Sequence, residues 1–389
     1  MRTIITKYYL YTFLISLHFF SAVLVPFFTD WGGISKTQMM ILQSWFMLWI
    51  FLLEIPTGVI ADYLGRKHSV AIGAFLSVVT SIVYASIPSF EIFLLGEFLF
   101  AAAYAFISGA EDAFLYDSLK EHGQEHESKR IFGMAHSIML FGFLVSAPIG
   151  SFIASRFGLN YPMLFRAIPS LIAFFIVLSL PEPKTADRTS EKRRYLDIAK
   201  KGFMFFYKHK LLRLIAIDGI IVSASAYFVI WLYQPVLQML QVPVFYFGFF
   251  HMILMASEIF VAMNFHNLDK WFGSTKGFLR FSAIVTALSF IAVAVFPNVI
   301  TVVALVIFGG GFGLSRIEYM LIYMNRMIPS SERATILSSI SMFRRLLLVF
   351  LNPVMGFVAD RSLPFAALLS GLLALLIFFF SPLEKEILE

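Results

Sequence analysis

The chain has no cysteine among its 389 residues, so disulfides and thiolate metal sites are excluded. Charged residues are also scarce. They make up 14% of the chain, whereas a soluble domain contains about a quarter. Hydrophobic residues make up 59%, and the mean hydropathy is +0.82. These proportions place most of the chain in lipid rather than in water.

The sequence also lacks the short motifs of several chemical functions. It has no glycine-rich phosphate loop with a lysine, no paired-histidine metal motif and no nucleophile elbow. We therefore expect no enzyme, no metal and no cofactor. ATP-driven transport is excluded on the same ground, so any transport by this chain would draw on an ion gradient, with H+ as the expected coupling ion. The net charge of +6 does not predict a nucleic-acid partner, because the basic residues lie between apolar runs.

Twelve apolar runs are long enough to cross a hydrocarbon core of ~30 Å at roughly 20 residues each. We therefore expect a multi-pass protein of the lipid bilayer. The runs are Tyr8–Phe28, Gln38–Ile60, Val70–Ile87, Phe90–Asp117, Ile131–Ser155, Pro162–Leu180, Leu211–Met239, Val244–Asn264, Phe278–Phe296, Val299–Asn325, Ala334–Ala359 and Pro364–Ser381.

Basic residues indicate the orientation of these runs. With both termini in the cytoplasm, the inner segments hold 23 of the 30 Lys and Arg residues. The outer segments hold only Lys36, Arg156, Arg166 and Arg361. We therefore expect both termini on the cytoplasmic side of the cell (cytoplasmic or inner) membrane. The first run follows two basic residues like a signal peptide, but it is long and lacks a cleavage pattern, so we expect an uncleaved span.

One long polar stretch divides the chain. We expect an N-terminal six-helix bundle over residues 1–181, a cytoplasmic linker over 182–210 and a C-terminal six-helix bundle over 211–389. Within the linker, Tyr195 to Tyr207 alternates lysine with aromatic and aliphatic residues. This pattern fits either an interfacial amphipathic helix or a solvated linker.

The two halves repeat each other weakly. Pro148-Ile-Gly-Ser-Phe-Ile-Ala-Ser-Arg156 parallels Pro353-Val-Met-Gly-Phe-Val-Ala-Asp-Arg361, and the two stretches lie 205 residues apart. Duplicated halves are typical of transporters in which two bundles rock about a site near the membrane midplane.

A short polar turn joins the second and third runs. It reads Gly58-Val-Ile-Ala-Asp62-Tyr-Leu-Gly65-Arg66-Lys67, and its charges and bent backbone must lie at a membrane surface. The pattern resembles the signature loop of the major facilitator superfamily of secondary transporters. The resemblance implies an all-α membrane protein with twelve transmembrane helices in two pseudo-symmetric six-helix bundles.

The resemblance also implies a conformational latch on the inner side. In the superfamily, an acid at the inner end of the fourth helix, here Asp117, pairs with the arginine of the signature loop, here Arg66. Asp62 is then expected near the inner start of the eleventh span. Such a latch stabilises one conformation and breaks in the other. We expect it to comprise Glu54, Gly58, Asp62, Gly65, Arg66, Lys67 and Asp117.

Charged residues inside the spans are the candidates for the substrate or proton pathway. An ionisable group there costs at least ~2.5 kcal/mol, so it should face a cavity or a partner. Spacings of three and four place one set of fourth-span residues on a single helical face. This set is Glu97, Ala101, Tyr104, Ser108 and Glu111.

The tenth span carries a comparable face with Arg316, which is equivalent to Glu111 at the 205-residue offset. In the superfamily fold, the fourth and tenth helices face each other across the central cavity. We hypothesise that Glu111 and Arg316 approach there and close an inner gate or bind a charged substrate. Alternatively, each is satisfied within its own half, Glu111 by a basic loop residue and Arg316 by Glu318 or another acid.

Other intramembrane charges complete the pathway candidates. Asp218 in the seventh span and Glu258 in the eighth are candidate proton sites, because burial disfavours an ionised carboxyl. Arg344, in the eleventh span, needs an acidic or anionic partner. Glu318 is one candidate, and an anionic substrate is another.

We therefore expect a monomeric secondary transporter that works by alternating access on a small-molecule substrate. The preferred function is proton-coupled export of an amphiphilic or drug-like molecule, since aromatic residues are many and cavity charges are few. A weak Gly-Pro element at Pro148 resembles that of antiporters. The alternatives are an ion-coupled symporter that takes up an anionic metabolite, a lipid flippase and a non-transporting membrane sensor.

Overall fold

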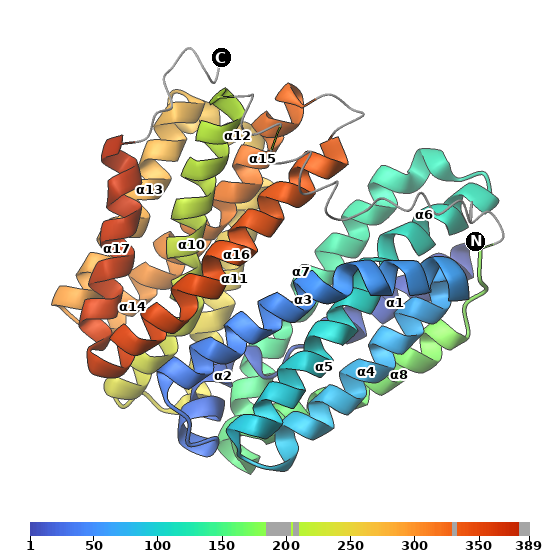
Figure 1. The fold of residues 1–389 in the computed structure, drawn as a ribbon, viewed down its shortest axis with the longest axis horizontal. Helices are drawn as coiled ribbons and strands as arrows, with labels where there is room; N and C mark the ends of the chain where they lie inside the picture. Colours follow the sequence, from blue (N-terminus) through green and yellow to red (C-terminus); the bar gives the residue numbers. More distant parts are fainter. Residues whose placement is uncertain (184–203, 205–209, 329–332, 381–389) are drawn as a thin grey trace. The chain divides into compact units, whose positions relative to one another are not determined.

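The computed structural model describes residues 1–183, 204, 210–328 and 333–380. Every regular element among these residues is helical (Figure 1). The chain divides into two compact units. Unit 1 comprises Met1–Lys192 with Val244–Gly248, and unit 2 comprises Arg193–Pro243 with Phe249–Glu389. The expected interfacial helix in the 182–210 linker lies almost wholly outside the described residues.

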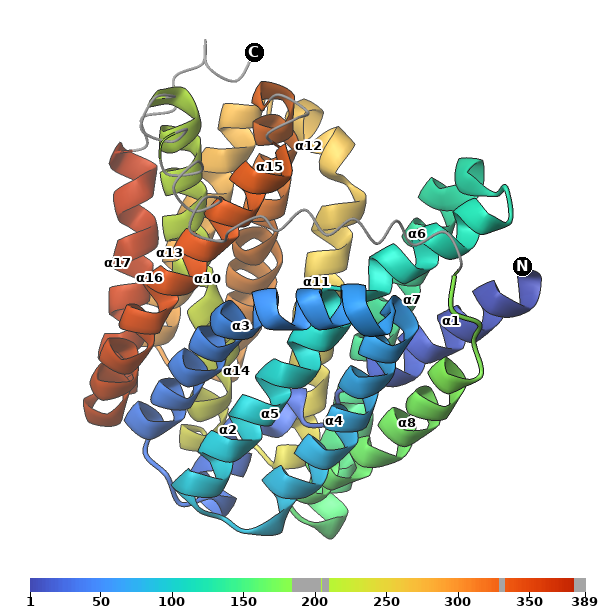
Figure 2. The same cartoon turned by 45° about the vertical axis from the view of Figure 1, so that its right-hand side comes forward.

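Unit 1 is built from long helices with short turns between them (Figure 2). Its principal helices are α1 (Arg2–Ile15), α3 (Lys36–Leu64), α4 (Arg66–Ser86), α5 (Phe90–Ser108), α6 (Glu111–Glu121), α7 (Ser128–Phe157) and α8 (Tyr161–Leu178). Short elements η1 (Ser21–Val23), α2 (Leu24–Pro26), η2 (Phe27–Trp31) and η3 (Glu125–Glu127) complete it, and η4 (Val244–Tyr246) packs on α7.

Unit 2 contains α10 (Lys210–Met239), α11 (Phe247–Met263), α12 (Phe265–Trp271), α13 (Thr275–Val295), α14 (Val299–Ala304), η5 (Leu305–Leu314), α15 (Ser315–Met327), α16 (Arg333–Arg361) and α17 (Leu363–Phe380). The first residue of α11 and its neighbour Gly248 pack with unit 1. Within unit 2, α17 packs against both α13 and α10.

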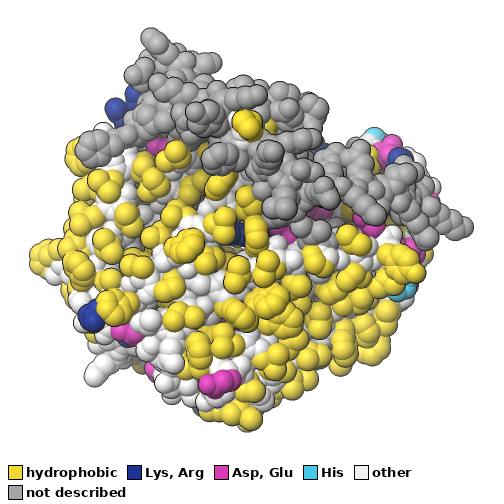
Figure 3. Space-filling model, in the orientation of Figure 1, with side chains coloured by type: hydrophobic (Ala, Val, Ile, Leu, Met, Phe, Trp, Pro, Cys, Tyr) yellow, Lys and Arg dark blue, Asp and Glu magenta, His cyan; other side chains and the backbone are white. Residues whose placement is uncertain are grey.

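Ten helical segments in the described part of the chain are long and apolar enough to cross a membrane. The apolar helix Leu363–Phe379 is slightly shorter, and the first expected span is broken. Large hydrophobic side chains cover much of the surface in Figure 3, and Phe141, Phe175, Phe260, Phe350 and Phe379 are each more than half exposed. The all-helical membrane fold expected from the sequence is confirmed.

Small side chains let the helices of unit 1 pack closely. The buried face of α4 is dominated by Ser, Ala, Gly and Thr, as at other helix interfaces in lipid. A Cβ on Gly73 would lie 2.8 Å from the carbonyl oxygen of Ala103. The absence of a side chain at Gly73 therefore brings α4 onto α5, and α4 also packs extensively on α8.

The first expected span, Tyr8–Phe28, is not one continuous helix. Helix α1 ends at Ile15, and an irregular segment of five residues precedes η1. Irregular backbone at membrane depth must be covered by protein. Helix α7 supplies that cover, because Gly142 faces Ser16 and Gly150 lies directly against the carbonyl of Phe19.

The fit between α7 and this break predicts a strong effect of one methyl group. In Gly150→Ala, the new Cβ would overlap the Phe19 carbonyl oxygen. We therefore expect the free energy of unfolding to fall by an amount at or above the upper end of the about 1–3 kcal/mol typical of overpacking. Gly133→Ala, on the same helix, meets no atom within 4 Å and should stabilise the helix by up to about 1 kcal/mol. Thermal unfolding of both purified variants in one detergent checks this. Equal melting temperatures would contradict the close packing.

Candidate functional site

The signature turn is held by its backbone as much as by its side chains. Gly65 has φ +105°, a conformation that only glycine adopts without strain, and it separates α3 from α4. The first two N–H groups of α4 donate to one carboxylate: Arg66 N lies 2.8 Å from Oε1 of Glu182, and Lys67 N lies 3.0 Å from its Oε2. An acid at a helix N-terminus is favourable. Sequence reasoning missed Glu182, although the tripeptide Pro181-Glu-Pro183 marks it as a charge fixed at a helix end.

The side chain of Arg66 joins the turn to α6. Its Nη1 forms an ion pair with Oδ2 of Asp117 and donates to the carbonyl oxygen of Ala113 at 2.9 Å. Both carboxylates around the turn, Glu182 and Asp117, therefore belong to unit 1. Asp62 and Glu54 are exposed on α3. The role of this cluster as a conformational latch stays a prediction.

Glu97 is a buried acid whose partners are neutral. It lies on α5 with 3% of its surface exposed, and Gln43 of α3 donates to its Oε1 at 2.8 Å. The hydroxyl of Tyr84, from α4, also hydrogen-bonds to this carboxyl. Three helices of unit 1 thus converge on one carboxyl, and its hydrogen-bond partners are an amide and a phenol rather than a cation.

Glu111 begins a new helix. The fourth expected span breaks at Gly109 and Ala110, so Glu111 is the first residue of α6. Its Oε1 accepts a hydrogen bond of 3.2 Å from the hydroxyl of Tyr8, which belongs to α1. Its neighbour along the chain, Asp112, is another acid. Glu111 therefore resembles Glu97 in having a neutral hydrogen-bond donor.

The remaining residues of the expected fourth-span face lie in a different environment. Tyr104 is 46% exposed, and Ser108 is exposed at the end of α5. The face therefore has a buried part around Glu97 and Ala101 and an open part around Tyr104 and Ser108. Amphipathic spacing alone could not separate the two.

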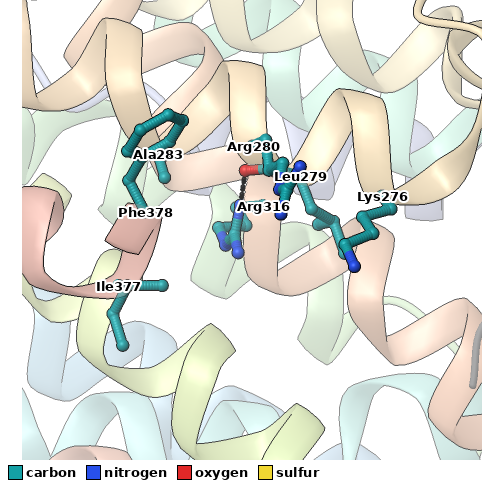
Figure 4. A pocket seen from close by; sticks show the side chains of 7 residues that line it. All are labelled: Lys276, Leu279, Arg280, Ala283, Arg316, Ile377 and Phe378. Carbon is teal, nitrogen blue, oxygen red and sulfur yellow. Dashed lines mark hydrogen bonds between the residues drawn. The ribbon is translucent and has the colours of Figure 1, made fainter. Parts of the chain in front are cut away.

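In unit 2, the structure joins two residues that the sequence treated separately. Nη2 of Arg316, on α15, forms an ion pair with Oδ1 of Asp218 on α10, and the two side chains are 1% and 0% exposed. Nη1 of Arg316 also donates to Ser282 Oγ at 2.7 Å and to the Leu279 carbonyl oxygen (Figure 4). The charge of Arg316 is thus balanced within its own half, by Asp218 rather than by Glu318. Its relation to Glu111 stays a prediction.

The other unit 2 candidates, Glu258 and Arg344, lie on α11 and α16. Glu258, on α11, is partly buried, and its carboxyl is close enough to the exposed Glu318 of α15 for like-charge repulsion. Arg344 is partly buried on α16. No cluster of three or more metal-ligating side chains occurs within the part of the chain that the structure describes.

Arg166 is a candidate that the sequence did not reveal. Its place near the start of the sixth run suggested an outer segment, but it lies in α8 with 2% exposure. Its Nη1 makes long hydrogen bonds of 3.4 and 3.3 Å to Ser77 and Ser81. Its guanidinium carbon lies 5.1 Å from the ring centre of Phe100 and 5.7 Å from that of Phe20. Its Nε is buried without a hydrogen-bond partner. The signal available in the sequence was a lone arginine four residues into an apolar run.

Known proteins resemble the chain over much of its length. A sequence model of the Major Facilitator Superfamily matches residues 9–350. An uncharacterised MFS-type transporter, YxaM of Bacillus subtilis, is 26% identical over 189 residues, or 47% of this chain and 46% of the relative. An uncharacterised transporter of Buchnera aphidicola is 32% identical over 124 residues, or 32% and 30% of the two chains. These matches span at most about half of the relatives' length.

Solved structures show the same fold at low identity. The nucleoside transporter NupG superposes with a TM-score of 0.81 at 16% identity, and the match covers 97% of this chain and 97% of NupG. An inward-facing bacterial homologue of the human lysosomal transporter Spinster gives 0.73 at 15% identity, with 97% and 94% coverage. Because the family model spans most of the sequence and the fold agrees, the chain belongs to the major facilitator superfamily.

Proposed function

We propose that this transporter couples the export of an amphiphilic or drug-like small molecule to proton movement, by alternating access. Glu97 carries the proposal. A buried carboxyl with neutral hydrogen-bond partners is disfavoured in its charged form, so it gains and loses a proton as its access to water changes. Asp218 has a different environment, because its charge is balanced by Arg316.

Glu111 and Glu258 are the further proton-site candidates. Glu111 accepts a hydrogen bond from the neutral Tyr8, and Glu258 lies near a second acid. In a proton relay, such groups exchange protons with water on one side at a time. We propose that Arg66 and Asp117 form the latch that holds one conformation, and that Asp62 contacts the second half when the inner side closes.

The substrate class follows from composition and exposure. Aromatic residues make up 17% of the chain, and the open part of the fourth span presents Tyr104 and Ser108. We propose that these side chains face the substrate, because such a surface suits a partly apolar ligand with few charges. We propose that the protein acts as a monomer in the cell membrane, with both termini in the cytoplasm.

Arg166 favours a second candidate, the uptake of an anionic metabolite by symport. A buried guanidinium that makes only weak hydrogen bonds to neutral groups leaves an uncompensated charge. An anionic substrate supplies a counterion. Arg316 does not support this candidate, because its charge is already paired with Asp218.

Flux into proteoliposomes tests the proposed function. Vesicles with an acidic interior and a pH-sensitive dye are given ethidium, uridine or succinate as amphiphilic, nucleoside and anionic probes. For an exporter, we expect ethidium to accumulate and to release protons from the lumen. Proton-linked succinate uptake with the opposite gradient would favour the symporter. Movement of labelled phospholipid alone would indicate a flippase, and no gradient-dependent movement of any probe would remove the transport proposal.

A further inference from the structure

A small hollow opens between α13 and α17 in unit 2. Figure 4 shows Lys276 and Arg280 on successive turns of α13, with Ile377 and Phe378 of α17 on the opposite side. Arg316 lies at the inner end, so the hollow borders the buried ion pair with Asp218. Leu279 and Ala283 complete the lining.

The charges around this hollow are unbalanced. Lys276 and Arg280 form no ion pair with an acid among the residues that the structure describes. The nearby carboxylate of Asp269 already accepts hydrogen bonds from Thr275 and Tyr319. Arg316 is paired with Asp218, but its buried Nε has no hydrogen-bond partner. Three cations therefore line one hollow, and among the described residues only Arg316 is paired with a carboxylate, that of Asp218.

The position of these cations on the helix increases the imbalance. Lys276 and Arg280 lie in the first two turns of α13, which has no acid in its first turn. The N-terminus of a helix is the positive end of its dipole, so basic residues there are unfavourable and an anion is stabilised. Lys276 and Arg280 are also spaced i, i+4, which places both on the same helical face.

The size and the walls of the hollow restrict the anion. The hollow and its open mouth together span about 270 Å³, and this volume includes open solvent. Ile377 and Phe378 form an apolar wall on one side. The enclosed part has room for only about one water molecule, so a phosphate group would lie at the open mouth beside Lys276 and Arg280. An attached hydrocarbon chain suits the apolar side of α17. Basic pockets between transmembrane helices bind anionic lipid headgroups in this way.

We propose that this hollow binds the phosphate of an anionic membrane phospholipid, with Lys276 and Arg280 as its direct contacts and the acyl chains beside α17. Its two direct contacts, Lys276 and Arg280, have no role in the proposed function. It is expected at the membrane surface where the basic loops lie.

Lipid retention measured by native mass spectrometry tests the site without a transport assay. The full chain is purified in mild detergent and titrated with phosphatidylglycerol or phosphatidylcholine of the same acyl composition. We expect preferential binding of phosphatidylglycerol, weakened about 30-fold in Lys276→Gln/Arg280→Gln, at about fivefold per removed charge. Lys270→Gln removes an exposed charge on the neighbouring α12, outside the hollow, and should leave binding near the wild-type level.

Each other outcome overturns the proposal. Equal binding of the two lipids would show that charge is not recognised. An equal loss in Lys270→Gln would assign the effect to general surface charge. Displacement of the lipid by an equal concentration of inorganic phosphate would identify a free-phosphate site.

The melting temperatures of the variants serve as the folding control. Unchanged values establish that the variants are folded when lipid is added.

Discussion

Purified Asp218→Asn protein is expected to unfold far more readily than the wild type. The substitution leaves the Arg316 guanidinium buried at 1% exposure without its counterion, and breaking a buried ion pair in this way costs about 3–5 kcal/mol. Ser282 and the Leu279 carbonyl still accept from Arg316, but neither neutralises its charge. Thermal unfolding in detergent, monitored by tryptophan fluorescence, measures the loss of stability.

Two further variants distinguish charge from shape at this site. Asp218→Leu/Arg316→Met removes both charges, and replacement of a buried pair by apolar residues is often close to neutral, so much of the stability should return. Glu258→Gln is the matched control in the same unit. It removes a carboxylate that is repelled by Glu318, and its stability should equal or slightly exceed that of the wild type.

The same measurement decides between two roles of Asp218. If Asp218 is a proton carrier, the role that the sequence suggested, the Asp218→Asn variant should fold normally and lose only coupling. If Asp218 is the counterion of Arg316, the variant should lose stability first. A melting temperature equal to that of the wild type would therefore contradict the structural role.

The global fold was predictable because the bilayer imposes a simple rule on sequence. Runs such as Val70–Ile87 without a charge have to cross lipid, and the signature turn at Gly65 fixes which family they belong to. The lipid environment allows only helices in such runs. Family membership and the all-helical fold therefore followed from the order of apolar and polar residues alone.

The partners of the buried charges were not predictable, because they depend on contacts distant in sequence. Arg316 and Asp218 are 98 residues apart, and Glu182 reaches the signature turn over 116 residues. Helical spacing shows which residues share a face but not which helix meets that face. The break after Ile15 was also hidden, since an apolar run with irregular backbone has the composition of a helix. It is the glycines of α7 that accommodate it.

Glu97→Gln protein is expected to move its substrate without accumulating it. A pH gradient of one unit supplies about 1.4 kcal/mol per proton, which supports about a tenfold solute gradient. Glutamine preserves the shape of the side chain and can still bond to Gln43 and Tyr84, but it cannot release a proton. We therefore expect the accumulation ratio in proteoliposomes to fall from about tenfold to about one.

Exchange of labelled for unlabelled substrate at equal pH provides the complementary measurement. This exchange needs binding and alternating access but no net proton movement, so Glu97→Gln should retain it. Glu91→Gln is the control, because Glu91 lies exposed in the first turn of the same helix α5 and should keep both activities. Loss of exchange in Glu97→Gln would instead assign Glu97 to substrate binding or to the packing of α3, α4 and α5.

Glu111→Gln distinguishes the two unit 1 acids that have neutral hydrogen-bond donors, Glu97 and Glu111. If only Glu97 carries the proton, Glu111→Gln keeps the tenfold ratio. If both carry one, the wild type reaches about a hundredfold and each single variant about tenfold. An accumulation ratio equal to that of the wild type in both variants would overturn proton coupling through unit 1. It would leave Glu258, which lies near Glu318 in unit 2, as the acid to test. A buried carboxyl with neutral partners is therefore an assignable coupling site, because its removal changes accumulation and exchange differently.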